Sequence, residues 1–151
     1  MPRVSVETLV HASQDRVYAA LSDMERFPEF MADLQAVVVL ERGEGYTVTA
    51  WTAKLRGVTF RWTERDQFLP GRIVYQQVSG DLKKFEGEWR LEDVSPGVVR
   101  VVLVTEFEFG VPMLAALLNP VGALILRDNA RSMLAALGPL VDAPKRDDRE
   151  G

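Results

Sequence analysis

The sequence contains no cysteine and only one histidine, His11, among its 151 residues. A chain without cysteine has no disulfide, no thiolate nucleophile and no sulfur-bound metal. A hydroxyl nucleophile assisted by histidine would have to be built around that single residue. The chain also lacks a glycine-rich phosphate loop and a spaced cluster of metal ligands. We therefore expect no metal and no cofactor.

Positive charge is also in short supply. Lysine and arginine number 18 against 22 for aspartate and glutamate, so the formal net charge is −4. A chain with this balance does not bind nucleic acid through overall electrostatic attraction, and we expect no nucleic-acid partner. A strand-like pattern begins at Arg3, where a signal peptide would need an apolar helix. This start predicts a cytoplasmic protein.

One uncharged run, residues 109–126, is nearly as long as the ~18–20 apolar residues that cross a bilayer. Two prolines, Pro112 and Pro120, and two glycines, Gly110 and Gly122, interrupt it. Short apolar blocks separated by proline predict the entry to a buried helix rather than a membrane span. Peripheral contact with a membrane surface stays open, and no pattern predicts an oligomeric state.

Hydrophobic periodicity predicts one strand, two short helices, six strands and a long helix, in that order. A strand over Arg3–Val10 is followed by a helix over Gln14–Ser22 that Ser13 caps, and by a helical turn from Asp23 that Pro28 breaks. The six strand-like runs are residues 37–42, 46–55, 58–68, 73–78, 83–92 and 98–109. The last helix runs from about residue 120 to 137 and is predicted to stop at Gly138-Pro139.

The turns between the six runs are too short for parallel crossovers, so consecutive strands must pair antiparallel. The economical packing for this order is a curved seven-stranded sheet that wraps around the long helix. The sequence therefore predicts an α+β helix-grip fold, with residues 1–141 as one domain. The charged tail, residues 142–151, lacks large apolar side chains and is predicted to be disordered.

Three segments carry a resemblance to a known family. Residues 80–91 read GDLKKFEGEWRL, residues 101–109 read VVLVTEFEF, and residues 23–31 read DMERFPEFM. Together they resemble the polyketide cyclase/dehydrase and coenzyme-Q-binding branch of the helix-grip superfamily, which also contains START and birch-pollen-allergen domains. The resemblance covers about residues 3–137. It implies an apolar cavity that holds a polyketide, quinone, sterol or other lipid.

The family includes aromatase/cyclases, quinone chaperones and proteins described as ribosome-association toxins. The aromatase/cyclases resemble this chain around Phe60 and Trp62, but they place a hydroxyl and then an arginine where Glu64 and Asp66 stand. They also carry a tyrosine near Leu34. The resemblance therefore does not imply a cationic group here that would hold a polyketide enolate.

Strand alternation assigns the walls of the expected cavity. Phe60, Trp62, Glu64 and Asp66 share one face of residues 58–68, and Gly87 is expected to leave room for a ligand or for the helix. The predicted lining residues are Phe27, Met31, Leu34, Phe60, Trp62, Glu64, Asp66, Phe85, Trp89, Leu103, Thr105, Phe107, Asn129 and Met133. The alternative is that these aromatic side chains fill a closed core.

Two polar features of this lining have two interpretations each. Glu64 and Asp66 lie on an apolar face, where an unpaired carboxylate is costly. Either they meet the cavity or its mouth, with Glu64 as the candidate general base or hydrogen-bond acceptor, or the strand end leaves the core and both pair with arginines at positions 61, 65 or 72. Asn129 either offers its amide to the cavity or bonds across to the sheet.

Three functions remain at this point. The first is a module that binds a hydrophobic small molecule, such as a lipid, quinone or polyketide, as a carrier or chaperone. The second is a cyclase/dehydrase-type enzyme that uses Glu64 for acid–base chemistry. The third, implied by the resemblance, is a toxin-like protein that acts on ribosome association.

Overall fold

The computed structural model describes residues 3–108 and 112–141, and the side chains of these residues except 112–119. The order of elements is a strand, two short helices, six strands and a long helix, as predicted. The elements are β1 (Arg3–Val10), α1 (Gln14–Ser22), the 3₁₀ helix η1 (Met24–Glu29), β2 (Leu34–Gly43), β3 (Tyr46–Leu55), β4 (Val58–Leu69), β5 (Arg72–Gly80), β6 (Lys84–Ser95), β7 (Val98–Glu108) and α2 (Pro112–Val141).

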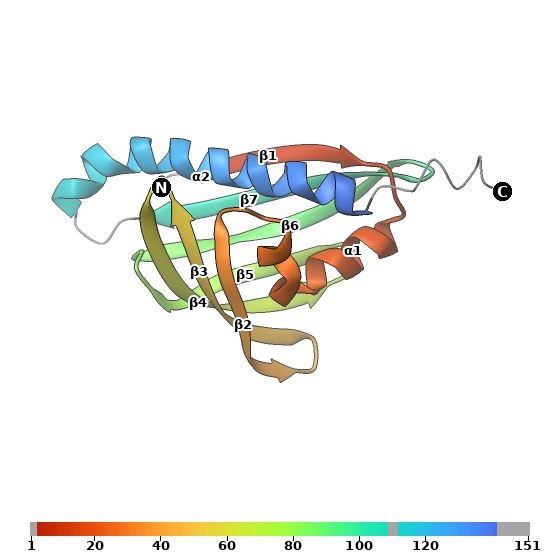
Figure 1. The fold of residues 1–151 in the computed structure, drawn as a ribbon, viewed down its shortest axis with the longest axis horizontal. Coiled ribbons are helices and arrows are strands. Elements are labelled where there is room, and N and C mark those ends of the chain that lie inside the picture. The colour runs from red at the N-terminus through yellow and green to blue at the C-terminus, as the bar shows by residue number, and fades with distance from the viewer. Residues whose placement is uncertain (1–2, 109–111, 142–151) are drawn as a thin grey trace.

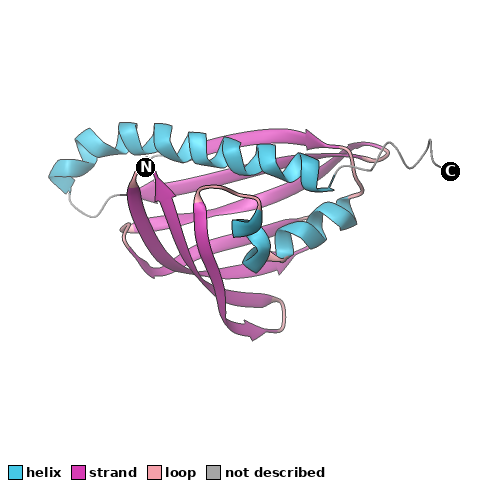
Figure 2. Ribbon diagram, viewed as in Figure 1, coloured by secondary structure: helices cyan, strands magenta, loops and turns pink. Residues whose placement is uncertain are grey.

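The seven strands form one antiparallel sheet in the order β1-β7-β6-β5-β4-β3-β2. From β2 to β7 each strand pairs with the one before it, because the short turns leave no room for a crossover. The two short helices carry the chain from β1 to the opposite edge of the sheet, and β1 pairs with β7 instead of β2. Figures 1 and 2 show all three helices on the same side of the sheet. The predicted helix-grip fold is confirmed.

Irregular pairing interrupts the ladders between β2 and β3, β4 and β5, and β6 and β7. The register slips in β2, near the end of β6, and between β4 and β5 at Thr63 and Glu64. A bulge of this kind increases the local twist and changes the direction of nearby side chains. In the β4–β5 pair the slip passes over Val78 and sets Glu64 opposite Gln77.

The two short helices, α1 and η1, form a wedge that packs on the sheet, with η1 against β2 and α1 against β6 and β7. Ser13 begins α1, and its hydroxyl oxygen accepts a hydrogen bond from the backbone N–H of Arg16 at 3.2 Å. Pro28 lies inside η1 and does not end it, since so short a helix has few internal hydrogen bonds for a proline to remove. Phe27 anchors the wedge, fully buried in the core. Leu34 is the first residue of β2.

Helix α2 is longer at both ends than the range 120–137 expected from the sequence, because it spans Pro112–Val141. Pro112 is the first residue of the helix, where a backbone N–H would have no partner within the helix. The missing N–H of proline therefore does not oppose a helix start at this position. Pro120 and Pro139 lie within the helix, so the predicted stop at Pro139 is wrong. The proline ring holds φ near its helical value, so the helix can continue through Pro120 and Pro139. Each proline removes one backbone hydrogen bond, and packing along the helix offsets that loss.

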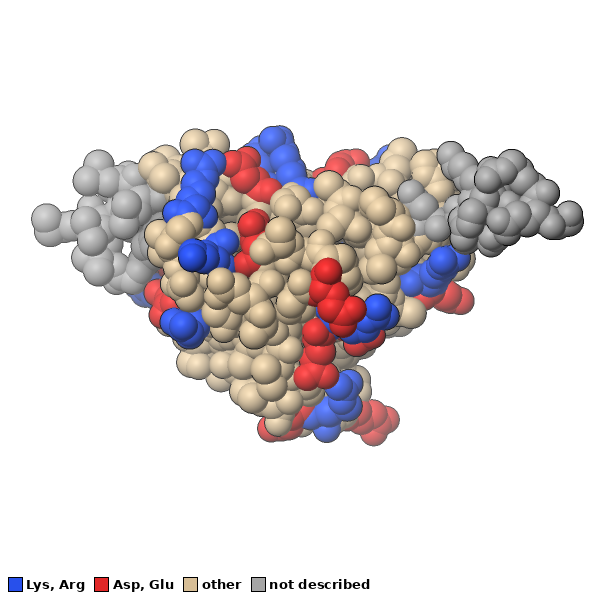
Figure 3. Space-filling model, viewed as in Figure 1, with Lys and Arg blue, Asp and Glu red and all other residues tan. Residues whose placement is uncertain are grey.

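Within the described residues, no helix has the length and hydropathy needed to cross a membrane. The part of the uncharged run at residues 109–111 and the tail at residues 142–151 lie outside the described residues. The predicted domain boundary at residue 141 and the disorder of the tail therefore stay predictions. On the face drawn in Figure 3, acidic and basic side chains are interspersed in small groups, and neither sign forms a broad patch.

Candidate functional site

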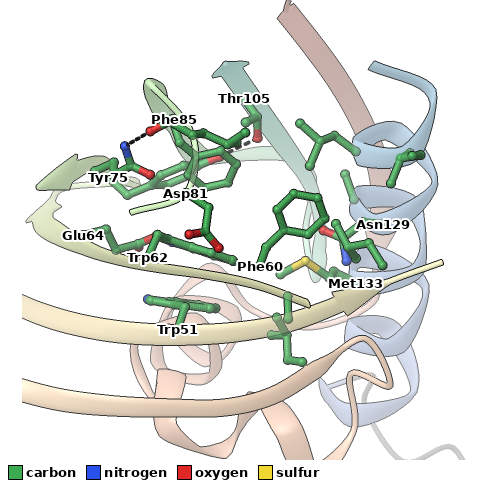
Figure 4. A pocket seen from close by; sticks show the side chains of 18 of the residues that line it. Trp51, Phe60, Trp62, Glu64, Tyr75, Asp81, Phe85, Thr105, Asn129 and Met133 are labelled. Carbon is green, nitrogen blue, oxygen red and sulfur yellow. Dashed lines mark hydrogen bonds between the residues drawn. The ribbon is translucent and has the colours of Figure 1, made fainter. Parts of the chain in front are cut away.

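A cavity of about 90 Å³ lies between the sheet and α2, and most of the side chains around it are apolar. In Figure 4, Asn129 and Met133 on the helix face the sheet residues Trp51 and Trp62 across this space. Arg61 and Asp81, both exposed, mark its open side. Its lining residues are Leu34, Trp51, Ala53, Leu55, Phe60, Arg61, Trp62, Glu64, Tyr75, Gln77, Asp81, Leu82, Phe85, Trp89, Leu103, Thr105, Gly122, Ile125, Leu126, Asn129, Ala130 and Met133.

Aromatic rings form a continuous wall across the strands β3 to β6. Trp51 and Trp62 are direct partners in the β3–β4 ladder, and their rings stack with centroids 5.7 Å apart at an interplanar angle of 10°. Phe85 contacts Trp62 at 5.1 Å and Tyr75 at 5.7 Å between centroids. Such a wall offers a large apolar surface with flat faces, which suits contact with apolar and planar groups.

Both acidic residues of β4 are buried: Glu64 is 4% exposed and Asp66 is 0% exposed. The Nε1–H of Trp62 donates to Glu64 Oε1 at 2.7 Å. The hydroxyls of Thr47 and Thr49 donate to Asp66 Oδ2 at 2.9 and 2.7 Å. Neither carboxylate forms an ion pair with an arginine or lysine among the described residues, so the predicted alternative of pairing with nearby arginines is wrong.

The register explains why strand alternation alone could not find these partners. Thr47 lies opposite Asp66 and Thr49 opposite Glu64 in the β3–β4 ladder, and both threonines are buried. The Thr49 hydroxyl also accepts a hydrogen bond from Trp51 Nε1–H at 2.7 Å. Neutral donors on the adjacent strand therefore stabilise Asp66 in place of a cation.

Burial raises the pKa of Glu64 well above its usual value, and a hydrogen bond with Asp66 and the nearby Asp66 charge raise it further. The hydrogen bond from Trp62 acts in the opposite direction. With both carboxyls ionised, Asp66 Oδ1 has no hydrogen-bond donor. A proton on Glu64 can be donated to the Asp66 carboxylate and removes one of two adjacent buried charges, so Glu64 is the protonated member of the pair.

Tyr75 and Thr105 form a second polar pair in the wall. Their hydroxyl oxygens are 2.5 Å apart, and the Tyr75 hydroxyl also donates to the carbonyl oxygen of Val104 at 3.1 Å. Burial raises the pKa of Tyr75, so this group stays neutral. A β-carbon on Gly87 would lie 2.7 Å from the Tyr75 hydroxyl. The space that Gly87 leaves is thus taken by the carbonyl oxygen of Val104 and by Tyr75, and not by a ligand or the helix as the sequence suggested.

Two more polar groups line the cavity at the end of β5 and the following turn. Gln77 donates through Nε2 to the carbonyl oxygen of Leu82 at 2.6 Å, while its Oε1 is buried without a partner. Asp81 Oδ2 accepts a hydrogen bond from the backbone N–H of Arg61 at 2.8 Å. Both contacts connect the β5–β6 turn to its surroundings and hold the mouth of the cavity in shape.

Helix α2 is tied to the rest of the domain by adjacent polar residues. Asn129 Nδ2 donates to Asp33 Oδ2 at 3.0 Å, in the loop before β2. Asp128 forms an exposed ion pair with Arg56 at 2.6 Å, in the turn between β3 and β4. Asn129 therefore borders the cavity, as the first interpretation expected, and its amide bonds to the loop before β2 and not to the sheet.

The family model described as polyketide cyclase/dehydrase and lipid transport matches residues 10–134. The chain belongs to this family. The ribosome association toxin RatA of Vibrio cholerae is 30% identical to it over 115 residues, which are 76% of this chain and 80% of that protein.

Solved structures show the same architecture. The protein TTHA0849 of Thermus thermophilus superposes with a TM-score of 0.85 at 26% identity, covering 91% of this chain and 95% of that one. The Zhui aromatase/cyclase of Streptomyces sp. R1128 superposes with a TM-score of 0.82 at 21% identity, covering 91% of each chain. The second likeness concerns the fold alone.

Most of the residues predicted to line the cavity of this family member border the observed space. The sequence-predicted residues found there are Leu34, Phe60, Trp62, Glu64, Phe85, Trp89, Leu103, Thr105, Asn129 and Met133. Phe27, Met31, Asp66 and Phe107 are buried but do not border it. Asp66 lies behind Glu64, where Thr47 and Thr49 enclose it.

Sequence reasoning missed Trp51, Tyr75 and Gln77, which border the cavity. Alternation from Ile73 through Tyr75 to Gln77 would have placed the last two on one face, so that signal was present. The face of Trp51 depends on the β3–β4 register, which the sequence does not state. Asp81 lies in a predicted turn, and only the fold brings that turn to the cavity.

The enclosed space is small for a ligand site. An apolar cavity of roughly 150 Å³ admits benzene, and drug-sized ligands occupy roughly 300 Å³ or more. The observed 90 Å³ therefore accepts a large ligand only if α2 or the β5–β6 turn moves outward. The open side at Arg61 and Asp81 is where such a ligand would extend.

Proposed function

We propose that the protein binds a hydrophobic small molecule, such as a lipid, quinone or polyketide-like compound, as a carrier or chaperone. The observation that carries the proposal is the aromatic-walled cavity between the sheet and α2. Membership of a family described by cyclase, dehydrase and lipid-transport functions supports it. Its few polar groups would orient the ligand, while the apolar walls would supply most of the affinity.

The rings of Phe60, Trp62 and Phe85 would make the main apolar contacts, with Leu103 and Met133 completing the walls. Covering one such aromatic side chain contributes on the order of 2 kcal/mol. Three or four contacts of this size suffice for micromolar affinity after the cost of association. Phe27, Met31 and Phe107 would support the walls from the core, and Asp66 would support Glu64.

Native mass spectrometry of freshly purified protein, followed by organic extraction, tests the proposal. We expect a bound hydrophobic compound that denaturation releases. The variant Ala130→Phe places a ring into the cavity from α2 and should abolish retention, whereas Ala135→Phe adds the same ring at an exposed position of that helix and should not. Protein that is free of ligand and binds none of the offered lipids, quinones and aromatic compounds would refute the proposal.

A cyclase or dehydrase reaction is an alternative function of the same cavity. Glu64 is the residue that would carry it, and because its proton is strongly held it would serve as a general acid rather than a base. Replacement by glutamine should abolish turnover and leave ligand retention intact. A Glu64→Gln variant with full turnover would exclude this role for the residue.

Action on ribosome association is a second candidate, favoured by the 30% identity to the RatA protein. The net charge of −4 gives no general attraction to RNA, so binding would need a specific contact. Co-sedimentation with separated ribosomal subunits at low salt is the direct test. Absence of the protein from the subunit fractions would remove this candidate.

A further inference from the structure

The two halves of α2 are held to the rest of the domain in different ways. Beyond Asn129 the helix packs into the core through several buried side chains, which are Ala130, Met133, Leu134, Leu137 and Val141. Among residues 120–128, in contrast, Val121 and Leu124 are 51% and 62% exposed, and only Gly122 is buried. The second half of the helix is therefore anchored in the core, and the described part of the first half is packed less tightly.

The first half of α2 covers the cavity. Gly122, Ile125, Leu126 and Asn129 line the cavity from this half, and Asn129 faces the sheet in Figure 4. A helix makes its backbone hydrogen bonds within itself, so α2 can tilt without breaking any of them. Gly122 lies about 22 Å along the helix from Leu137, and a tilt of about 10° about the anchored half would move Gly122 by about 4 Å. That distance is about one apolar contact spacing.

Two side-chain contacts from consecutive residues hold the first half against the sheet. Asp128 pairs with Arg56 in the β3–β4 turn at 2.6 Å, and both side chains are more than half exposed. Asn129 Nδ2 donates to Asp33 Oδ2 at 3.0 Å. We call these two contacts the latch. An exposed ion pair and a single side-chain hydrogen bond are weak, so the latch favours the closed position of the helix without locking it.

The β5–β6 turn, on the open side of the cavity, is held more firmly. The backbone N–H of Asp81 donates to the carbonyl oxygen of Arg61 at 3.0 Å, and Asp81 Oδ2 accepts from the backbone N–H of Arg61 at 2.8 Å. The backbone N–H of Lys83 donates to the carbonyl oxygen of Glu108 at 2.9 Å. Moving the turn outward would break these hydrogen bonds of the backbone, whereas lifting α2 breaks only the latch and weak apolar packing. The helix is therefore the element that yields more easily.

We propose that residues 120–129 of α2 are a lid over the cavity, and that a ligand enters when the latch opens. The inference rests on the proposed binding function and assigns the step that admits the ligand. The closed cavity of about 90 Å³ is smaller than the roughly 150 Å³ that admits benzene, so the closed form does not accept an aromatic ligand. The observed rate of association is then proportional to the fraction of protein whose lid is open.

The association rate constant of N-phenyl-1-naphthylamine, a neutral fluorescent dye with three aromatic rings, tests the lid in stopped-flow experiments on the full-length protein. Asp33→Ala combined with Asp128→Ala removes both latch contacts at residues that do not line the cavity. This double variant should bind the dye about tenfold faster, which corresponds to about 1.4 kcal/mol in the opening equilibrium. Glu29→Ala removes an ion pair of similar exposure from η1 and should keep the wild-type rate. A wild-type rate in the double variant would overturn the inference.

The lack of cysteine in the sequence permits the opposite test, in which the lid is tethered. In the variant Arg56→Cys/Asp128→Cys, a short bismaleimide joins the two thiols, and mass spectrometry confirms the link. The same variant with N-ethylmaleimide on both thiols is the control, since it has the same substitutions and no tether. We expect the tethered protein to bind the dye about tenfold more slowly than the control.

Equal rates for the tethered protein and its control would overturn the lid and leave the proposed binding function standing, because the dye still binds. A failure of the binding function gives a different result. In that case the wild-type protein binds neither the dye nor any of the offered lipids and quinones, and it carries no extractable ligand, so both proposals are overturned.

Discussion

Replacing Glu64 by glutamine should make the stability of the protein less dependent on pH. In the folded state the pKa of Glu64 is raised, by burial first and by Asp66 second, above its usual value of 4.5. A group of this kind binds its proton more tightly in the folded state than in the unfolded chain. Its contribution to stability is therefore fully present below pH 4.5 and is lost as the pH rises through the folded-state pKa.

The magnitude follows from proton linkage. Between the unfolded and folded pKa values, each pH unit lowers the free energy of unfolding by up to about 1.4 kcal/mol. Glutamine resembles the protonated acid: its carbonyl oxygen can accept from Trp62 as Glu64 does, and its amide can donate to the Asp66 carboxylate. The variant should therefore keep the hydrogen bonds of the wild type at low pH and avoid the loss at higher pH.

The assay is urea denaturation at several values between about pH 5 and pH 8, followed by far-ultraviolet circular dichroism. The difference in free energy of unfolding between variant and wild type should move in favour of Glu64→Gln as the pH rises. Glu44→Gln, at an exposed turn, should follow the wild type throughout. Parallel pH profiles for Glu64→Gln and the wild type would refute the claim that Glu64 holds its proton.

Two further substitutions test the packing around the cavity. Thr49→Val removes the acceptor of the Trp51 N–H and a donor to Asp66, and should lower the free energy of unfolding in urea by about 2 kcal/mol. Thr49→Ser keeps both hydrogen bonds, so equal stability of the two variants would contradict this network. Gly87→Ala would place a β-carbon 1.8 Å from the carbonyl oxygen of Val104 and should lower the free energy of unfolding by about 3 kcal/mol. A loss below about 1 kcal/mol would contradict this prediction, because it would show that the β6–β7 pair moves apart to admit the β-carbon.

The fold could be predicted from the sequence because its determinants are local. Turns such as Pro70-Gly71 and Gly80-Asp81 are too short for anything but antiparallel pairing, so they specify the order of β2 to β7. Period-two alternation in β4 placed Phe60 and Trp62 on the inner face. The ends of α2 were not predictable in this way, since Pro139 disfavours a helix locally and tertiary packing decides the outcome.

The site was predictable only where a single strand decides the position of a side chain. That Asp66 is buried became clear only when the register brought Thr47 and Thr49 alongside β4. Alternation assigns Asp66 to a face but does not reveal the neighbours that make its burial possible. The position of Gln77 opposite Glu64 depends on a bulge, and a one-residue slip in pairing leaves no mark in the sequence.

The position of the two carboxyls links the stability of the fold to its use. Apolar side chains of similar volume at positions 64 and 66 would be expected to stabilise the sheet, because a buried charge costs more than its hydrogen bonds return. In this chain Glu64 borders the cavity beside the stacked rings of Trp51 and Trp62, and Asp66 lies directly behind it. Perturbed acids gather where a protein meets a ligand. A ligand that fills the cavity beside Glu64 binds the folded protein only, and the bound protein should therefore unfold at a higher temperature than the free protein.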